Sequence, residues 1–187
     1  MTTISDVMDQ TNFKMNKTIE LLRADLATVR AGRATPSLLE KVFVDYYGTP
    51  TPVSQVANVS VPEPRMIVIQ PWERNLLKDI EKAIMKSDLG LNPNNDGTVI
   101  RLNLPQLTEE RRKELVKVVH KKAEDSRVVI RNVRREANEL IKKIEKAKEI
   151  TEDEAKKATE EMQKTTDKFI KEIDVIMAHK EKEVMEV

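Results

Sequence analysis

The first thirty residues carry apolar side chains at a helical spacing. An apolar residue recurs every seven positions, at Met8, Met15, Leu22 and Val29. Because seven residues are close to two turns of an α-helix, these side chains form one stripe along a helix. Thr3 precedes the stripe as a candidate N-cap, and Gly32 follows it where a helix-terminating glycine is expected. The pattern predicts an amphipathic helix between these two residues.

Between residues 35 and 105 the apolar residues fall in short runs separated by proline and glycine. The runs that predict β-strands, because they are short and rich in β-branched residues, are 42–47, 56–61, 66–69 and 99–104. A helical spacing predicts a helix at about 75–87. The sequences GTPTP at 48–52 and NDG at 95–97 are typical of turns, the second of a hairpin turn. The segment therefore predicts a small α/β module with its own core.

The helical spacing returns after Pro105 and continues to the end of the chain. Thr108 is followed by two glutamates and Thr151 by three acidic residues, and acidic side chains are stabilising at the positive end of a helix dipole. At 1.5 Å per residue, the two predicted helices would be about 60 and 50 Å long. The expected apolar stripe of the first helix includes Val119, Val129, Ile130 and Val133, and that of the second includes Met162, Phe169, Ile173 and Ile176.

Three amphipathic helices can bury their apolar stripes only against one another. We therefore expect an α+β fold in which residues 1–31 and 106–187 form a long three-helix bundle and residues 32–105 form an inserted small α/β (β/α/β) domain. The chain crosses between the two domains near residues 33–36 and 103–107, and two adjacent crossings make a natural hinge. Pro36 and Pro105 stiffen the crossings, which predicts limited rotation; a single rigid elbow is the alternative.

Charge is distributed unevenly along the chain, although the net charge is only +1. Residues 101–148 hold fifteen basic and eight acidic side chains, whereas residues 149–187 hold seven basic and twelve acidic ones. Such asymmetry is typical of a surface that binds a polyanion. The alternative is that two neighbouring helices complement each other.

The composition points away from several classes of protein. Cysteine is absent, which excludes disulfides and thiolate sites and fits a cytoplasmic protein. The N-terminus shows no signal peptide, and the longest apolar runs are too short to span a membrane. The two histidines, His120 and His179, are far apart, and the four glycines form no phosphate-binding loop. We expect no catalytic activity, no metal and no cofactor.

Four arginines fall within nine residues of the predicted long helix: Arg127, Arg131, Arg134 and Arg135. At 100° per residue the first three lie within about 60° of one another, which predicts a row that faces solvent beside the apolar stripe. Arginine is suited to bind phosphate oxygens with two donors at once. An ordinary solvated face is the alternative, with Glu124 paired to Arg127 and Glu139 to Arg135.

Five segments resemble the motifs of bacterial ribosome recycling factors. They are RAGRATPSLL (30–39), YYGTPTP (46–52), EKAIMKSDLGLNPNNDGTVIRLNLP (81–105), LTEERRKEL (107–115) and RVVIRNVRREAN (127–138). The resemblance extends over the whole chain with the motifs in the same order. It implies an L-shaped molecule with a three-helix bundle and an inserted α/β domain.

The resemblance also implies a function. Family members are translation factors that bind the post-termination ribosome, with the bundle on large-subunit rRNA. With elongation factor G and GTP hydrolysis by that partner, they split the ribosome into subunits and release it from mRNA. We accordingly expect a cytoplasmic monomer that needs no cofactor and does not bind a membrane.

The site residues follow from the same resemblance. The rRNA contacts implied by the family motifs are Arg134, Arg131, Arg135, Arg30, Arg33 and Arg112, to which the arginine row adds Arg127. The implied hinge, at 31–35 and 103–107, includes Gly32, Arg33, Ala34, Thr35, Asn103, Leu104, Pro105 and Gln106. Gln106 departs from the family, in which many members have proline, and this predicts a somewhat looser hinge.

Two other classes of function stay open on the residues alone. A coiled-coil adaptor would bind another protein helix and would leave apolar residues exposed along the stripe. A hydrolase in the α/β module would need several carboxylates near Tyr46, Tyr47 or Trp72, where Asp45 alone is evident.

Overall fold

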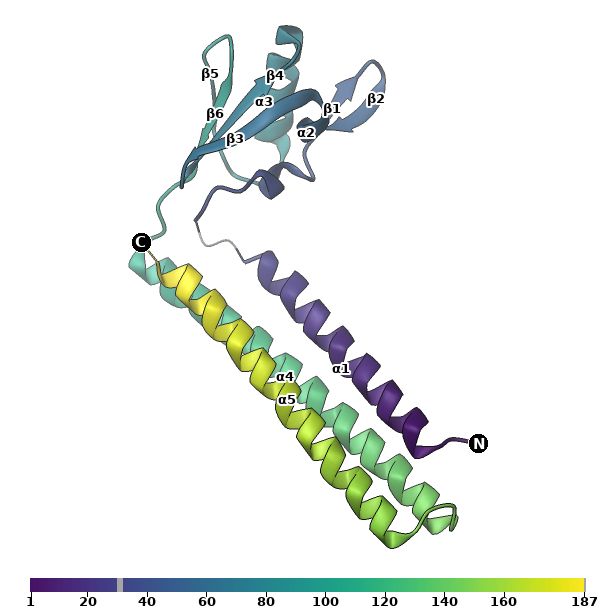
Figure 1. The fold of residues 1–187 in the computed structure, drawn as a ribbon. Coiled ribbons are helices and arrows are strands. Elements are labelled where there is room, and N and C mark those ends of the chain that lie inside the picture. Colours follow the sequence, from purple (N-terminus) through teal and green to yellow (C-terminus); the bar gives the residue numbers. More distant parts are fainter. Residues whose placement is uncertain (30–31, 187) are drawn as a thin grey trace. The chain divides into compact units, whose positions relative to one another are not determined.

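The chain folds into two compact units. The computed structural model describes residues 1–29 and 32–186. One unit is made of residues 1–31 and 109–187, and the other of residues 32–108. The first, the helical unit, consists of long helices, and the second, the α/β unit, combines a small sheet with a helix (Figure 1). The α+β fold class predicted from the sequence is confirmed, and the second boundary lies three residues beyond the expected one.

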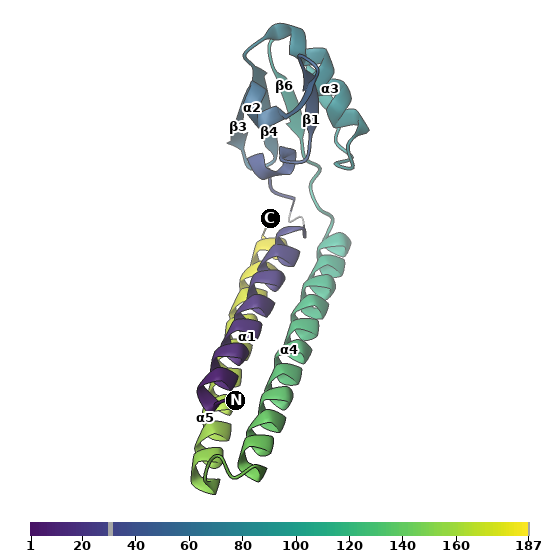
Figure 2. The same cartoon turned by 90° about the vertical axis from the view of Figure 1, so that its right-hand side faces the viewer.

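The helical unit consists of α1 (Ile4–Ala27), α4 (Glu109–Lys146) and α5 (Glu152–Met185). Their 24, 38 and 34 residues correspond to about 36, 57 and 51 Å at 1.5 Å per residue. The three helices run side by side in both views, with α4 antiparallel to its two neighbours (Figures 1 and 2). Because α1 is the shortest, it covers only part of the groove between α4 and α5.

Two of the three helix starts are capped as the sequence predicts. The Thr3 hydroxyl accepts a hydrogen bond from the backbone N–H of Asp6, and the Asp6 carboxylate accepts one from the N–H of Thr3. Thr151 and Glu154 form the same reciprocal pair at the start of α5. Such a capping box satisfies two N–H groups that would otherwise lack partners.

The expected end of α1 is wrong. The helix ends at Ala27, with Thr28 as its C-cap, so Gly32 is not the glycine that terminates it. Gly32 has a φ of +75°, and a Cβ atom added to it would lie 3.1 Å from Cγ of Leu107. The glycine therefore serves the connector, where one crossing segment passes close to the other.

The apolar stripes meet in the core of the helical unit. Along α5 every expected stripe residue is buried, with Met162 and Ile173 fully so. Burying such a side chain stabilises the fold by about 1.5–3 kcal/mol. Along α4 the expected stripe residues Val119, Ile130 and Val133 are buried, Leu140 is partly buried and Val129 is 46% exposed. Val129 was wrongly assigned to the stripe, because one helical step of 100° from the buried Ile130 turns it away from the core.

The α/β unit contains a two-stranded and a four-stranded sheet. Its elements are η1 (Pro36–Leu39), β1 (Phe43–Tyr46), β2 (Thr49–Pro52), α2 (Val53–Val56), β3 (Ala57–Glu63), β4 (Met66–Pro71), η2 (Arg74–Leu76), α3 (Leu77–Lys86), β5 (Pro93–Asn95) and β6 (Ile100–Asn103). The sheet has the strand order β3-β4-β6-β5, and all its pairings are antiparallel. The hairpin turn expected at 95–97 joins β5 to β6, which confirms that prediction.

The GTPTP segment forms a strand where the sequence predicts only a turn. Tyr47 and Gly48 alone make the turn, with φ values of +50° and +85°. Thr49–Pro52 then pairs with β1 to form a two-stranded sheet. Proline is tolerated here because neither strand of this hairpin has a second neighbour that would need its missing N–H.

The core of the α/β unit lies between α3 and the four-stranded sheet. Ile80 and Ile84 of α3 are fully buried, as are inward-facing residues of β4 and β6 such as Ile69 and Ile100. Alternate residues of β4 and β6 face this core, the pattern of a sheet with one covered face. The α/β unit thus forms its core from its own residues, without residues of the helical unit.

Candidate nucleic-acid interface

The four clustered arginines of α4 differ in exposure. The side chain of Arg127 is only 15% exposed and that of Arg131 is 39% exposed. Arg134 is half-buried and Arg135 is exposed. The prediction that the row faces solvent is therefore wrong for Arg127. The reason is that α5 covers the flank of α4 on which Arg127 lies.

Arg127 is held between two carboxylates. Its Nη2 and Nε donate to Oδ1 of Asp174 on α5, at 2.6 and 3.0 Å, and its Nη1 donates to Oε2 of Glu124 at 3.1 Å. Burial alone would lower the pKa of Arg127, but the hydrogen bonds to Asp174 and Glu124 outweigh it and raise the pKa. Arg127 thus joins α4 to α5, and its charge is balanced within the protein.

Arg131 shares one of these carboxylates. Its Nη1 donates to Oε1 of Glu124 at 3.2 Å. Hydrogen bonds from Arg127, and secondly from Arg131, lower the pKa of Glu124 below its ordinary value. One carboxylate therefore bridges two guanidinium groups and offsets the repulsion between them.

Arg134 and Arg135 have neutral partners. Nη1 of Arg134 donates to Oε1 of Gln163 on α5 at 3.2 Å, and Nη1 of Arg135 donates to Oδ1 of Asn132 at 3.4 Å. Over the described part of the chain neither arginine pairs with a carboxylate, and the expected pair of Arg135 with Glu139 does not form. Among the described residues, no carboxylate therefore balances the charge of either guanidinium group.

Of the remaining predicted contacts, the structure places only Arg112 relative to this row. Arg112 is on the same helix, 22 residues before Arg134, which is about 33 Å along the axis. Its Nε is buried and has no hydrogen-bond partner among the described residues. Arg33 belongs to the α/β unit, and Arg30 lies outside the described residues. Among the described residues of the helical unit, the predicted contacts that the structure brings together are the four arginines of one short stretch.

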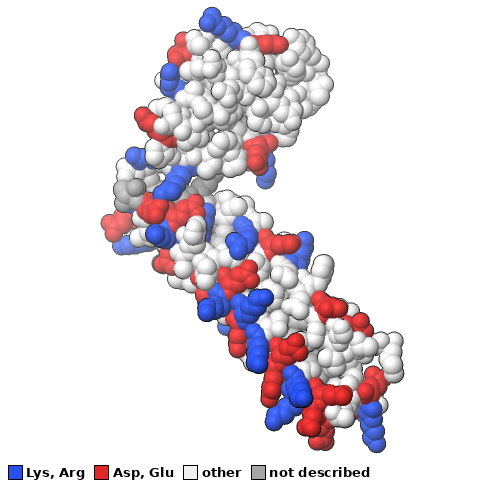
Figure 3. Space-filling model, viewed as in Figure 1, with Lys and Arg blue, Asp and Glu red and all other residues white. Residues whose placement is uncertain are grey.

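Sequence reasoning missed the acidic and amide partners on α5. Asp174 and Gln163 contact the arginine row, and Glu181 lies 2.9 Å from Nε2 of His120. The negative charge of residues 149–187 was the only available signal, because the register between two antiparallel helices is not a local property. The alternative that the two helices complement each other is thus observed at Arg127 and His120. Figure 3 shows basic and acidic side chains interspersed along the helical unit.

Three of the predicted hinge residues are bonded into the α/β unit. The N–H of Ala34 donates to the carbonyl of Pro64 at 2.7 Å, and the N–H of Leu104 donates to that of Arg65 at 2.8 Å. Asn103 is the last residue of β6 and pairs with β4. These bonds fix both connectors to the β3–β4 turn. Along the chain, Gly32, Arg33, Pro105 and Gln106 lie on the helical-unit side of these bonds, whereas Thr35 precedes η1 within the α/β unit. Ala31, the first residue of the expected hinge, lies outside the described residues.

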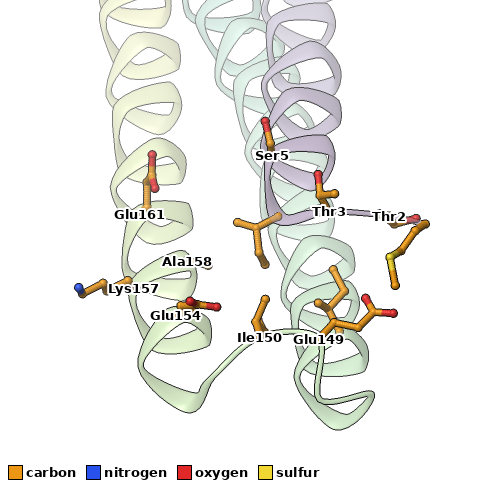
Figure 4. A pocket seen from close by; sticks show the side chains of 12 residues that line it. Thr2, Thr3, Ser5, Glu149, Ile150, Glu154, Lys157, Ala158 and Glu161 are labelled. Atoms are coloured by element: carbon orange, nitrogen blue, oxygen red, sulfur yellow. The ribbon is translucent and has the colours of Figure 1, made fainter.

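A cavity of about 490 Å³ opens at the end of the helical unit, among the start of α1, the end of α4 and the start of α5. Figure 4 shows Ile150 between Glu154 and Glu149, with Glu161 further along α5. Within the described ranges no cluster of His, Asp or Glu side chains could hold a metal ion. Among those same residues, no helix combines the length and the apolar character needed to cross a membrane.

The fold and this surface define a two-domain α+β protein with an arginine-bearing helical face. The model of the family described as ribosome recycling factor matches residues 22–185. The ribosome-recycling factor of Syntrophomonas wolfei is 62% identical over 184 residues, which are 98% of this chain and 100% of that protein. That of Caldicellulosiruptor bescii is 63% identical over 174 residues, 93% of this chain and 95% of the relative.

Solved structures agree with the sequence comparisons. A solution structure of the ribosome recycling factor matches with a TM-score of 0.79 and 46% identity, covering all of both chains. A second match has a TM-score of 0.64 and 48% identity, covering 99% of this chain and 100% of the other. It comes from models of the T. thermophilus ribosome recycling factor and the E. coli elongation factor G bound to the E. coli post-termination complex. The chain belongs to the ribosome recycling factor family.

Proposed function

We propose that the protein binds large-subunit rRNA of the post-termination ribosome through the arginine row of α4. With elongation factor G and GTP hydrolysis by that partner, it then splits the ribosome into subunits and releases it from mRNA. The observation that carries the proposal is that Arg134 and Arg135 lie on a rigid 38-residue helix and have only neutral partners among the described residues. Family membership supports the ribosome as the target.

The chemistry of the row suits a phosphate backbone. A guanidinium group has five N–H donors, and Arg134 and Arg135 each use one in the contacts described above. The remaining donors can bind phosphate oxygens in pairs. Because each phosphate contact releases bound counterions, the affinity should fall steeply with salt. A helix also holds its side chains more precisely than a loop, which favours a fixed pose on the RNA.

The proposed mechanism is mechanical. The helical unit anchors to RNA, and the α/β unit transmits force from the GTPase, which supplies the energy. The predicted hinge comprises residues 31–35 and 103–107. We place its pivot on the helical-unit side of Ala34 and Leu104 along the chain. The hydrogen bonds of these two residues to Pro64 and Arg65 make them part of the α/β unit.

The adaptor alternative is not favoured. It requires a row of apolar residues to be exposed along a helical stripe, whereas the stripe of α5 is buried from Ala155 to Val184 and Val129 is the exposed member of the stripe expected on α4. The hydrolase alternative needs several carboxylates near Tyr46, Tyr47 or Trp72. Besides Asp45, the structure brings Glu73 to the two tyrosines, where it accepts hydrogen bonds from the hydroxyls of Tyr46 and Tyr47 and is thereby used in structural contacts.

Co-sedimentation with large ribosomal subunits over a salt series tests the proposal. We expect Arg131→Ala/Arg134→Ala to weaken binding by at least about tenfold and to reduce the salt slope by about two. The matched control is Lys164→Ala/Lys171→Ala, which removes two positive charges from exposed positions of α5. An equal loss in the control would show that net charge, not the row, governs binding. No binding by the wild type at low salt would overturn the proposal.

A further inference from the structure

Polar contacts between α4 and α5 follow a seven-residue ladder. His120 contacts Glu181, and seven residues further along α4 Arg127 contacts Asp174, which lies seven residues earlier on α5. The two helices are antiparallel, so each step of two turns down one helix matches two turns up the other. In both of these pairs α5 supplies a carboxylate.

The next step of the ladder departs from this rule. Seven residues beyond Arg127 lies Arg134, and the matching position on α5 is Asp167. Arg134 nevertheless donates to Oε1 of Gln163, one turn earlier on α5, at 3.2 Å. Nε2 of Gln163 donates in turn to Oδ1 of Asp167 at 2.8 Å. The amide therefore stands between the guanidinium group and the carboxylate.

The orientation of this amide follows from the chemistry of its partners. A guanidinium group only donates hydrogen bonds and an ionised carboxylate only accepts them. The oxygen of Gln163 must therefore face Arg134 and its nitrogen must face Asp167. Both ends of the amide are used, and its position is set from two sides.

We propose that Gln163 is a positioning residue for RNA binding, which holds Arg134 through a neutral oxygen and keeps Asp167 away from it. The inference rests on the proposed function and names a residue of α5 that governs the availability of an arginine of α4. Arg134 is thereby held in place as Arg127 is, but by a neutral group and not by carboxylates that balance its charge.

Arg127 provides the internal comparison. It contacts two carboxylates at 2.6–3.1 Å, so a phosphate that approached it would meet their negative charge and would have to displace them. An amide oxygen carries no formal charge and imposes no such cost. A hydrogen bond to a neutral partner still restricts the side chain, which reduces the entropy lost when it binds.

The decisive variant is Gln163→Glu/Asp167→Asn. It leaves the net charge unchanged and places donor and acceptor groups at the same two positions, but it puts the carboxylate against Arg134. We expect the affinity for large ribosomal subunits to fall on the order of fivefold and the salt slope to become shallower by about one. The helical circular dichroism signal and the melting temperature should not change, because Gln163 and Asp167 are exposed.

Three further variants make the result interpretable. Asp167→Asn alone keeps the amide on Arg134 and should bind within about twofold of the wild type. Gln163→Glu alone provides a second test should the double variant unfold. Arg134→Ala should weaken the wild type but have little further effect in the swapped background, because the charge is already neutralised there.

The outcomes separate the two proposals. Wild-type binding with equal affinity and equal salt slope in the swapped variant would overturn the role of Gln163 alone. Failure of the wild type to bind would overturn the proposed function and this inference with it. A shallower slope that depends on Arg134 would support both.

Discussion

The two units of this protein differ most clearly in how they use charge. In the α/β unit, residues 46–62 form a run of seventeen without a charged side chain, although 35% of the whole chain is charged. The face shown in Figure 3 is largely uncharged over this unit, whereas basic and acidic side chains alternate along the helical unit. The difference is consistent with the proposal that the helical unit is the one that binds rRNA.

The units also bury their apolar residues in different ways. The α/β unit packs a helix and a sheet around one compact core, with Ile80 and Ile100 fully buried. The helical unit has a long, narrow core in which each helix contributes one stripe. Because each core is built from its own unit, stability and binding should be separable by mutation.

The largest expected effect comes from a cavity in one core. Ile100→Ala in the α/β unit and Ile130→Ala in α4 each truncate a fully buried side chain, and each should destabilise its own unit by about 2–5 kcal/mol. Urea unfolding followed by fluorescence of Trp72 reports on the α/β unit, and far-ultraviolet circular dichroism reports mainly on the helices. If either variant shifts both signals equally, the two units unfold as one and the comparison fails.

A smaller effect is expected within the arginine row. Arg127→Ala should lower the free energy of unfolding by about 1–2 kcal/mol, because it removes a mostly buried guanidinium group whose carboxylate partners are half exposed and can be rehydrated. Arg135→Ala, at an exposed position, should cost less than about 0.5 kcal/mol.

The effects of the same two substitutions on ribosome binding should have the opposite order to their effects on stability. Arg135→Ala should weaken binding more than Arg127→Ala, since the charge of Arg127 is already balanced by Asp174 and Glu124. Co-sedimentation of both variants at one salt concentration measures this. A larger binding loss for Arg127→Ala would mean that Arg127 contacts RNA after all, as the sequence pattern predicts.

The smallest effect concerns acid stability of the α/β unit. Hydrogen bonds from the N–H of Val99, the guanidinium group of Arg101 and the N–H of Thr98 lower the pKa of Asp96 from 3.8 to about 2. A depressed pKa in the folded state means that this stabilisation is complete above pH 3.8 and is lost as the pH falls towards 2. Asp96→Asn should therefore flatten the dependence of unfolding on pH within that window.

Acid titrations of the Trp72 signal, compared between wild type and variant, measure this change. Asp88→Asn, which removes another exposed carboxylate of the same unit, is the control. A curve for Asp96→Asn that parallels the wild type would show that this turn does not contribute to acid sensitivity.

Local features of this protein could be read from the sequence because they depend on neighbouring residues. The capping boxes at Thr3 and Thr151 join residues three positions apart, and the stripe of α5 follows from helical periodicity. The arginine row itself is local, since one helix sets its spacing. The family could be inferred as well, because its motifs lie in order along the chain.

What only the tertiary structure decided is which partner each charged group meets. The spacing on α4 placed Arg127 and Arg134 on one flank, but the register of α5 against α4 gave Arg127 a carboxylate and Arg134 an amide. The pairing of Thr49–Pro52 with β1 and the contact of Gly32 with Leu107 likewise join segments whose approach no local pattern specifies. Periodicity determines the direction of a side chain from its own helix, whereas burial and charge balance depend on what packs there.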